Sequence, residues 1–168
     1  PGARLGPDAI RAHLIPRLRD SPIKYLDLGD IGLPPKPAST DAHARYAREI
    51  LEVCALFDAR VRHHIPKGTL PVILGGDHSV GYCVVRQFAN ADEGLLWFDA
   101  HGDFNTEATS PSGNVHGMPV AAISGLALQR LVRHAHPLVA EDRIALVGVR
   151  NLDPGERALL DDSQITVF

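Results

Sequence analysis

The sequence has few cysteines, few aromatic residues and no long apolar run, and each shortage excludes a class of protein. Only two of its 168 residues are cysteines, Cys54 and Cys83, which is too few for a disulfide framework. We therefore expect a reducing compartment, the cytoplasm, in which both cysteines act as small buried hydrophobic side chains. No apolar run approaches the ~20 residues that span a bilayer, so we expect no membrane association.

Positive charge is not concentrated in any part of the sequence either. Lysine and arginine number 17 against 20 acidic residues, for a net charge of -3. Because no basic stripe is interleaved with aromatic residues, we expect no nucleic-acid partner. The remaining composition, 45% hydrophobic and 22% charged, is that of an ordinary globular protein. No repeat or linker divides residues 1–168, so we expect a single domain.

The sequence contains one methionine, Met118, so residue 1 is not an initiator methionine. The last residues, 164–168, have the apolar and β-branched pattern that begins a buried strand. We therefore expect the sequence to be part of a longer chain, and its domain to be incomplete at both ends.

Short apolar segments alternate with helical patterns along the chain. We expect strands at 24–29, 70–74, 94–98, 143–149 and 164–168, and helices from residue 7, after residue 41, at 79–88, at 117–134 and from residue 154. Apolar strands of this kind between helices indicate a parallel, doubly wound α/β sheet. In such sheets the ligand site lies beyond the carboxyl ends of the strands.

Three metal-binding side chains follow the expected strand 94–98. They are Asp99, His101 and Asp103, and in extended chain such alternate positions project to one side. Two carboxylates this close raise each other's pKa unless a cation stabilises both ionised forms. A purely structural role does not explain three ionisable groups that leave a buried strand. We therefore predict a metal site.

Two further polar groups also follow expected strands. His78 comes after strand 70–74 and Asp153 after strand 143–149, so both belong at the same edge of the sheet. Oxygen ligands mixed with imidazole favour Mn, Fe or Zn. Two such ions, about 3.5–4 Å apart, would lower the pKa of a bridging water and make it a nucleophile at neutral pH. The residues thus predict a metal-dependent hydrolase.

Four motifs resemble those of the arginase branch of the ureohydrolase family. They are GGDHS (75–79), DAHGDFN (99–105), SGNVHGMP (112–119) and VGVRNLDPGE (147–156). Their order and spacing match the family over essentially the whole chain. A single DxHxD motif would be weak, because histone-deacetylase-like relatives carry similar ligands. The resemblance implies an arginase-like three-layer α/β sandwich, with a doubly wound, mostly parallel sheet and two Mn2+ ions per complete subunit.

The resemblance also implies roles for individual residues. His78, Asp99 and Asp103 would bind one manganese ion. His101, together with Asp99 as a bridging ligand, would bind the other. Asp103 would also help to hold a metal-bridging hydroxide, which attacks the guanidinium carbon of L-arginine. His116 would shuttle protons at the mouth of the site, and the products would be L-ornithine and urea.

A second set of residues would bind the amino-acid end of the substrate. The resemblance implies Asn105, Ser112 and Asn114 for the α-carboxylate, and Asp153 and Glu156 near the α-ammonium group. Agmatinases generally lack the SGN segment, so arginine is the preferred substrate over agmatine, another guanidino acid or formiminoglutamate. Residues 112–114 are also compatible with a plain turn. Asp153 and Glu156 are equally compatible with a helix capping box.

Three features of the family have no counterpart in residues 1–168. These are the strand before PGARLGP, a later DxDxxDP-type motif that gives aspartates to both metals, and an acidic residue near the guanidinium group. These residues would then offer three ligands to one ion and two to the other. A catalytically inactive fragment is therefore a further alternative. For the full-length protein, the resemblance implies a homo-oligomer, a trimer or a hexamer.

Overall fold

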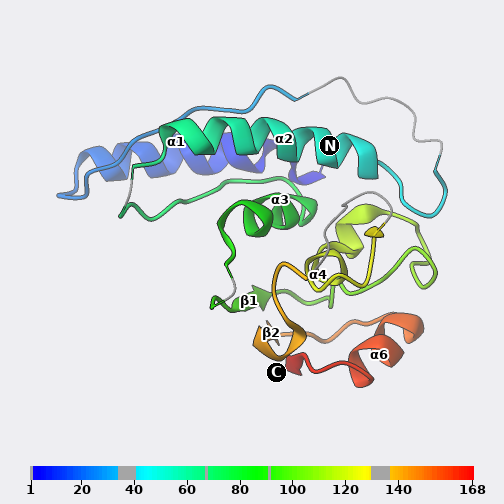
Figure 1. Cartoon of the computed structure of the whole chain (residues 1–168). Helices are drawn as coiled ribbons and strands as arrows, with labels where there is room; N and C mark the ends of the chain where they lie inside the picture. The colour runs from blue at the N-terminus through cyan, green and yellow to red at the C-terminus, as the bar shows by residue number, and fades with distance from the viewer. Residues whose placement is uncertain (1, 34–40, 67, 91, 130–136) are drawn as a thin grey trace.

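A small parallel β-sheet lies in the lower part of Figure 1, with α3 above its strands and α6 beside them. The computed structural model describes residues 2–33, 41–66, 68–90, 92–129 and 137–168. The helices are α1 (Gly6–Arg19), α2 (Ala47–His64), α3 (Ser79–Phe88), α4 (Pro119–Ile123) and α6 (Pro154–Asp161). The strands are β1 (Leu95–Phe98), β2 (Ile144–Val147) and β3 (Thr166–Val167), and short 3-10 helices are η1 (Gly2–Leu5), η2 (Val115–Gly117) and η3 (Glu141–Arg143).

The sheet has the order β1-β2-β3, and both pairs of strands are parallel. Leu95 pairs with Ile144 and Ala145 with Thr166. Parallel neighbours require crossover connections, and helices supply them here. The expected α/β class and three of the five expected strands are therefore confirmed, with the described strands somewhat shorter than predicted.

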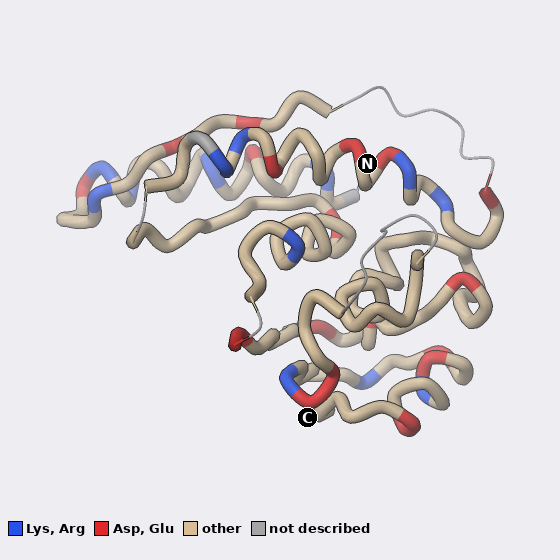
Figure 2. The backbone as a smooth tube through the Cα atoms, in the orientation of Figure 1, with Lys and Arg blue, Asp and Glu red and all other residues tan. Residues whose placement is uncertain are grey.

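Helices α2 and α3 pack against each other, and Gly81 of α3 lies against Trp97 of β1. The apolar side of α2 is buried or partly buried, and there the ring of Phe57 meets that of Phe88 edge-on, with centroids 6.3 Å apart. An ion pair between Arg86 and Asp58, 2.6 Å long, links the same two helices. Acidic and basic residues intersperse along α1 and α2 (Figure 2). Among the described residues, no helix is both long enough and apolar enough to span a membrane.

Two of the predicted strands are wrong. Segments 24–29 and 70–74 are not in strands, and no described strand pairs with either. Segment 24–29 is instead held by side chains: Arg11 pairs with Asp27, and Arg60 donates to the Leu28 carbonyl. Segment 70–74 leaves much of its apolar surface exposed. A strand needs a partner for its backbone groups, and apolar composition alone does not supply one.

The predicted helix 117–134 is interrupted in the structure, where residues 124–128 are not helical. Helix α4 ends at Ile123, and Gly125 then adopts a left-handed φ of 84°. A glycine in this conformation shortly after the last helical residue is a common way to end a helix. Residues 130–134 lie outside the described part of the chain.

The expectation for the cysteines is half right. Cys54 and Cys83 are buried, 0% and 1% exposed, but they are joined by a disulfide rather than packed as separate thiols. They lie on facing sides of α2 and α3, with Cα atoms 4.8 Å apart. The number of cysteines indicates whether a protein has a disulfide framework. It does not show whether two particular cysteines become neighbours in the fold.

Candidate active site

The candidate site lies where β1 and β2 end and continue into loops. The ladder extends one residue further, because the Asp99 N–H donates to the Val147 carbonyl over 3.2 Å. Beyond it, the N–H groups of Arg150 and Asn151 both donate to the Ala100 carbonyl, over 2.9 and 3.0 Å. These bonds hold the loop after β2 against the loop after β1. Motifs that are about 50 residues apart in the sequence therefore meet at one edge of the sheet, as expected for parallel strands.

Three of the predicted metal ligands meet in this place. His78 Nδ1 lies 2.7 Å from an oxygen of Asp99 and 2.9 Å from an oxygen of Asp103. One ligand atom from each of the three residues lies within 4.8 Å of the others. An imidazole and two carboxylates form a donor set that suits first-row divalent ions, including Mn2+. The geometry therefore fits a metal ion; that these residues bind one stays a prediction.

The two carboxylates of this group have pKa values shifted in opposite directions. Burial raises the pKa of Asp103, and the charge of Asp99 adds to this, outweighing the opposite effect of His78. At Asp99, burial also acts to raise the pKa, but the backbone N–H groups of His101 and Ala100, together with the His78 ring, leave it lowered. A bound cation would stabilise the ionised form of both carboxylates, which is the electrostatic reason for placing one here.

Turns rather than an extended strand bring Asp103 to the site. The strand ends at Phe98, and Asp103 has a φ of 49°, in the left-handed region. Its carbonyl accepts from the Val120 N–H at the start of α4, over 3.0 Å. A Cβ on Gly102 would lie 2.8 Å from the Leu152 side chain and 2.9 Å from Glu156 Oε1, so a larger residue here would displace these two side chains. The extended-chain argument for residues 99–103 was therefore wrong in geometry, although Asp99 and Asp103 do converge.

His101 lies beside this group of three rather than within it. Its side chain is 57% exposed, and its Nδ1 lies 3.4 Å from Asp99 Oδ1. His78 contacts the other oxygen, Oδ2. Asp99 thus stands between two histidines, one at each carboxylate oxygen, as a bridging ligand would. The predicted role of His101 at a second ion is compatible with this position and stays a prediction.

His78 is held in place by the start of α3 and by an aromatic ring. It is the N-cap residue of α3, and its ring meets that of Trp97 on β1 edge-on, with centroids 5.0 Å apart. Gly81 allows α3 to lie this close to the strand, since a Cβ there would be 2.5 Å from the Trp97 ring. Asp77 Oδ1 accepts from the Ser79 N–H over 3.0 Å and so supports the helix start.

The residues predicted for the amino-acid end of the substrate begin with Asn105, which is 5% exposed. Its amide nitrogen donates to Asp153 Oδ2 over 3.0 Å, and its amide oxygen accepts from the Thr109 hydroxyl over 2.9 Å. The backbone N–H of Asn105 donates to the Gly117 carbonyl over 3.1 Å. Asn105 therefore links three of the surrounding loops into one wall.

The capping reading of Asp153 and Glu156 is confirmed. Asp153 is the N-cap of α6, and the side chains of the two residues form a reciprocal capping box. Glu156 is 3% exposed, and its Oε1 also accepts from the Phe104 N–H over 2.9 Å. Burial raises the pKa of Glu156, although the N–H groups of Phe104 and Asp153 partly offset this. Both side chains also line the open cavity that His78, Asp99 and Asp103 border. A substrate role stays a prediction for each.

The turn at residues 112–114 is anchored by the segment before α2. Gly113 has a φ of 66°, and its carbonyl accepts from the Arg45 N–H over 2.7 Å. A Cβ on Gly113 would come within 1.9 Å of the Ala42 carbonyl oxygen, so only glycine fits here. The Ser112 hydroxyl accepts from the Asn114 N–H over 3.2 Å. The plain-turn reading is thus correct for the backbone, and it leaves the side chains available for a further role.

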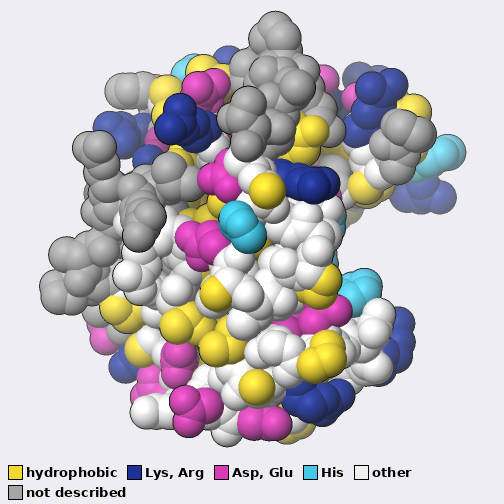
Figure 3. Space-filling view, turned by 90° about the vertical axis from the view of Figure 1, so that its right-hand side faces the viewer, with side chains coloured by type: hydrophobic (Ala, Val, Ile, Leu, Met, Phe, Trp, Pro, Cys, Tyr) yellow, Lys and Arg dark blue, Asp and Glu magenta, His cyan; other side chains and the backbone are white. Residues whose placement is uncertain are grey.

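These groups surround one open cavity of about 380 Å3. Its lining residues are Gly76, Asp77, His78, Asp99, His101, Asp103, Asn105, Ser110, Ser112, His116, Gly117, Asn151, Asp153 and Glu156. Figure 3 shows a notch in the surface with acidic and histidine side chains at its margin. The volume is in the range of small-molecule sites. His116, carried by η2, is exposed at this cavity.

All but one of the predicted site residues line this cavity. Asn114 is the exception, because it does not border the cavity. Among the lining residues that sequence reasoning missed, Asp77 lies inside GGDHS and Asn151 inside VGVRNLDPGE. Their position next to predicted site residues in the sequence could have identified them as lining residues. Ser110 carried no comparable signal, since it precedes the SGN segment in a stretch that resembles any polar loop.

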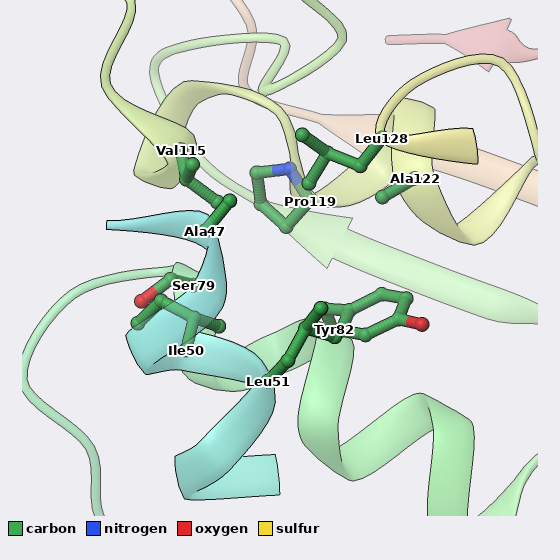
Figure 4. A pocket seen from close by; sticks show the side chains of 9 residues that line it. All are labelled: Ala47, Ile50, Leu51, Ser79, Tyr82, Val115, Pro119, Ala122 and Leu128. Carbon is green, nitrogen blue, oxygen red and sulfur yellow. The ribbon is translucent and has the colours of Figure 1, made fainter. Parts of the chain in front are cut away.

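A second, apolar cavity lies between α2, α3 and the η2–α4 segment (Figure 4). It has a volume of only about 10 Å3. Space of this size holds at most one water molecule. It is lined almost entirely by apolar side chains, so it is a packing gap of the core and not a substrate site.

Comparison with known proteins identifies the family. The sequence model of the Arginase family matches residues 1–168. The arginase of Bacillus subtilis (strain 168) is 37% identical over 172 aligned positions, which cover 99% of this chain and 58% of the relative.

Two solved structures agree with this result. The arginase from Bacillus cereus superimposes with a TM-score of 0.87 at 36% identity, covering 99% of this chain and 58% of that one. The Entamoeba histolytica arginase in complex with L-ornithine gives a TM-score of 0.84 at 33% identity, with coverage of 99% and 59%. The chain thus spans a little under three-fifths of the length of these relatives, and it belongs to the arginase family.

Proposed function

We propose that the complete protein hydrolyses the guanidinium group of L-arginine to L-ornithine and urea. The observation that carries this proposal is the meeting of His78, Asp99 and Asp103 in a cavity that Asn105 and Ser112 also line. Membership of the arginase family supports arginine as the substrate. Residues 1–168 would form a single arginase-like α/β domain, to which the longer chain contributes the rest.

The chemistry of the donor set supports manganese as the cofactor. His78, Asp99 and Asp103 would hold one Mn2+ ion, and His101 with Asp99 would contribute to a second. Manganese, when bound, would lower the pKa of a water molecule so that hydroxide is available near neutral pH. Asp103, whose carboxylate is almost fully buried, would accept a hydrogen bond from the attacking oxygen and orient it towards the guanidinium carbon.

The departing amine of ornithine needs a proton. When the tetrahedral intermediate collapses, the bond between the guanidinium carbon and the side-chain nitrogen breaks, and that nitrogen leaves as an amine. His116 lies at the cavity and is exposed to solvent, so it would take a proton from water and deliver it to this nitrogen. Histidine is the side chain that most often carries out such proton transfers in enzymes.

The other end of the cavity would recognise the amino acid. The hydroxyl of Ser112 and the amide of Asn105 are hydrogen-bond donors for the α-carboxylate, and Asn114 would support them from the same turn. Asp153 and Glu156 would supply negative charge near the α-ammonium group. Agmatine has no carboxylate, so these donors would lack a partner in an agmatinase. This is the reason to prefer arginine over agmatine.

The test is urea release by the complete natural chain, supplied with Mn2+ and offered arginine or agmatine. We expect urea from arginine and much less from agmatine. Ser112→Ala should raise the KM for arginine about tenfold and leave kcat nearly unchanged, because one hydrogen bond to a charged group is lost. Ser163→Ala, remote from the cavity at the end of α6, is the matched control. Turnover of agmatine or formiminoglutamate without turnover of arginine would contradict the proposed substrate.

Metal binding can be measured separately by fluorescence, because Trp97 is the only tryptophan in residues 1–168 and lies at the site. Its ring lies against that of His78, so its fluorescence should respond to Mn2+. Asp103→Asn should weaken the response to Mn2+ by about 100-fold in affinity, since a charged ligand is lost. Asp161→Asn, at the exposed end of α6, should leave the affinity unchanged. Equal affinities in the two variants would refute the ligand assignment.

Two further features are proposed on family membership alone. We infer a homo-oligomer, a trimer or a hexamer, for the complete protein, and a cytoplasmic location. Light scattering of the purified full-length protein would measure the first, and fractionation of the source cells the second.

A further inference from the structure

The disulfide between Cys54 and Cys83 is not used by the proposed reaction, yet it joins the two helices nearest to the site. It links α2 to α3 in the core, where both side chains are almost completely inaccessible. The Cα atoms are 4.8 Å apart, within the range that a disulfide requires without backbone movement.

The same environment also accommodates the reduced form. The Cys83 sulfur lies 3.9 Å from the Ile50 carbonyl oxygen, which would accept a hydrogen bond from a thiol S–H. The apolar cavity of Figure 4 lies next to this contact and is lined in part by Ile50 and Leu51. Two separate thiols repel at disulfide distance, so reduction moves α2 and α3, or the two side chains, apart at this point. Both oxidation states are therefore compatible with the core.

The two helices lead to two different parts of the wall of the active-site cavity. Cys83 belongs to α3, whose N-cap residue is the predicted metal ligand His78. Cys54 belongs to α2, and Arg45, just before that helix, is bonded to Gly113 in the predicted carboxylate-binding turn. The disulfide is thus a covalent connection between the element that places a metal ligand and the element that places the substrate turn.

We propose that Cys54 and Cys83 form a reversible dithiol–disulfide pair that fixes the separation of these two parts of the wall. In the oxidised form a covalent bond ties these elements together, and in the reduced form non-covalent contacts such as the Arg86–Asp58 ion pair and the Cys83–Ile50 contact join the helices. The effect on arginine binding rests on the proposed function, whereas the redox reaction and its effect on stability do not.

The reaction needs an oxidant of the small-molecule disulfide class, such as oxidised glutathione. One cysteine thiolate attacks a sulfur of the oxidant, forms a mixed disulfide and releases the first thiol. The second cysteine thiolate then attacks the sulfur of its partner cysteine and releases the second thiol. The two cysteines lose two electrons and two protons in total, and the oxidant becomes two thiols. Because both sulfurs are buried, the exchange proceeds only when α2 and α3 separate transiently.

The experiment equilibrates the complete natural protein in glutathione buffers of increasing ratio of oxidised to reduced form, followed by alkylation of free thiols. Mass spectrometry counts the alkylated cysteines, and the Tm and the KM for arginine are measured on the same samples. As the proportion of oxidised glutathione rises, we expect Cys54 and Cys83 to change from both alkylated to neither, with the Tm of the reduced form about 5–10 °C lower. The KM should be about fivefold higher in the reduced form, with a smaller change in kcat.

The double variant Cys54→Ala/Cys83→Ala is the control, since its Tm and KM should not respond to the buffer. Alkylation of both Cys54 and Cys83 at every glutathione ratio would overturn the proposal, and so would a disulfide whose reduction leaves both the Tm and the KM unchanged. These outcomes are distinct from failure of the proposed function. If the protein releases no urea but its mass and Tm respond to the buffer, the redox pair stands and the arginase proposal falls.

Discussion

Gly113 offers the sharpest test of how the substrate turn is held. Gly113→Ala introduces a Cβ where the Ala42 carbonyl oxygen would be only 1.9 Å away. The contact is with backbone, which cannot turn aside as a side chain can. Gly113 also has a φ of 66°, a conformation that alanine adopts only with strain. The turn at residues 112–114 must therefore move away from the segment before α2.

The cost has two separate parts. Holding a residue with a Cβ in the left-handed conformation costs roughly 1–2 kcal/mol. Displacing the turn also breaks the hydrogen bond from Arg45 to the Gly113 carbonyl, 2.7 Å long, for a further loss of about 0.5–1.5 kcal/mol. Together they lower the free energy of unfolding by about 1.5–3.5 kcal/mol, which corresponds to a fall in Tm of about 3–14 °C for a domain of this size.

Thermal unfolding and arginine kinetics would measure the two consequences. Because Ser112 moves with the turn, the KM for arginine should rise much more than kcat falls. Gly32→Ala is the matched control, since a Cβ there meets nothing within 4 Å and its φ is not positive. If Gly113→Ala matched Gly32→Ala in both Tm and KM, the reasoning about this turn would be refuted.

Three further predictions concern α3 and its contacts. Gly81→Ala should shift the fluorescence of Trp97 and weaken Mn2+ binding, because a Cβ 2.5 Å from that ring pushes α3 away from β1; an unchanged emission maximum would contradict this. Arg86→Ala should lower the free energy of unfolding in urea by about 1.5–3 kcal/mol, since it leaves the Asp58 carboxylate without its charged partner; the double variant with Asp58→Ala should recover part of this loss. Burial raises the pKa of Tyr82 to about 12, so the neutral phenol is favoured in the folded state. The stability that this provides is fully present below pH ~10 and is lost as the pH rises towards 12, and Tyr82→Phe should abolish this part of the pH dependence of urea unfolding.

The sequence was most informative where chemistry and pattern pointed to the same place. The segments after β1 and β2 carry polar residues that a buried strand end does not explain, and parallel pairing brings them together. Helix α6 was predictable from Asp153, Pro154 and Glu156, which are consecutive features of one capping box. These predictions depend on local residue types and on one rule of sheet topology, so they transferred to the structure.

Other features depend on contacts that the sequence does not display. Segment 70–74 has the composition of a buried strand, yet Leu70 and Val72 are 87% and 70% exposed and no described strand pairs with them. The disulfide depends on the packing of α2 against α3, which brings two cysteines 29 positions apart into contact. The left-handed φ of Asp103 is a third case, because aspartate is found in that conformation only occasionally.

The position of Asp99 between two histidines has a consequence for the two proposed ions. One of its oxygens contacts His78, which also contacts the buried Asp103, whereas the other oxygen lies near the exposed His101. The described residues thus supply a compact set of three ligands on one side and a partial set on the other. A carboxylate whose charge is already balanced by one cation attracts a second cation less strongly. We therefore expect Mn2+ to bind in two steps of unequal affinity. Because the first step involves His78, it should produce the larger change in Trp97 fluorescence, and equal steps in the titration would contradict this account of the site.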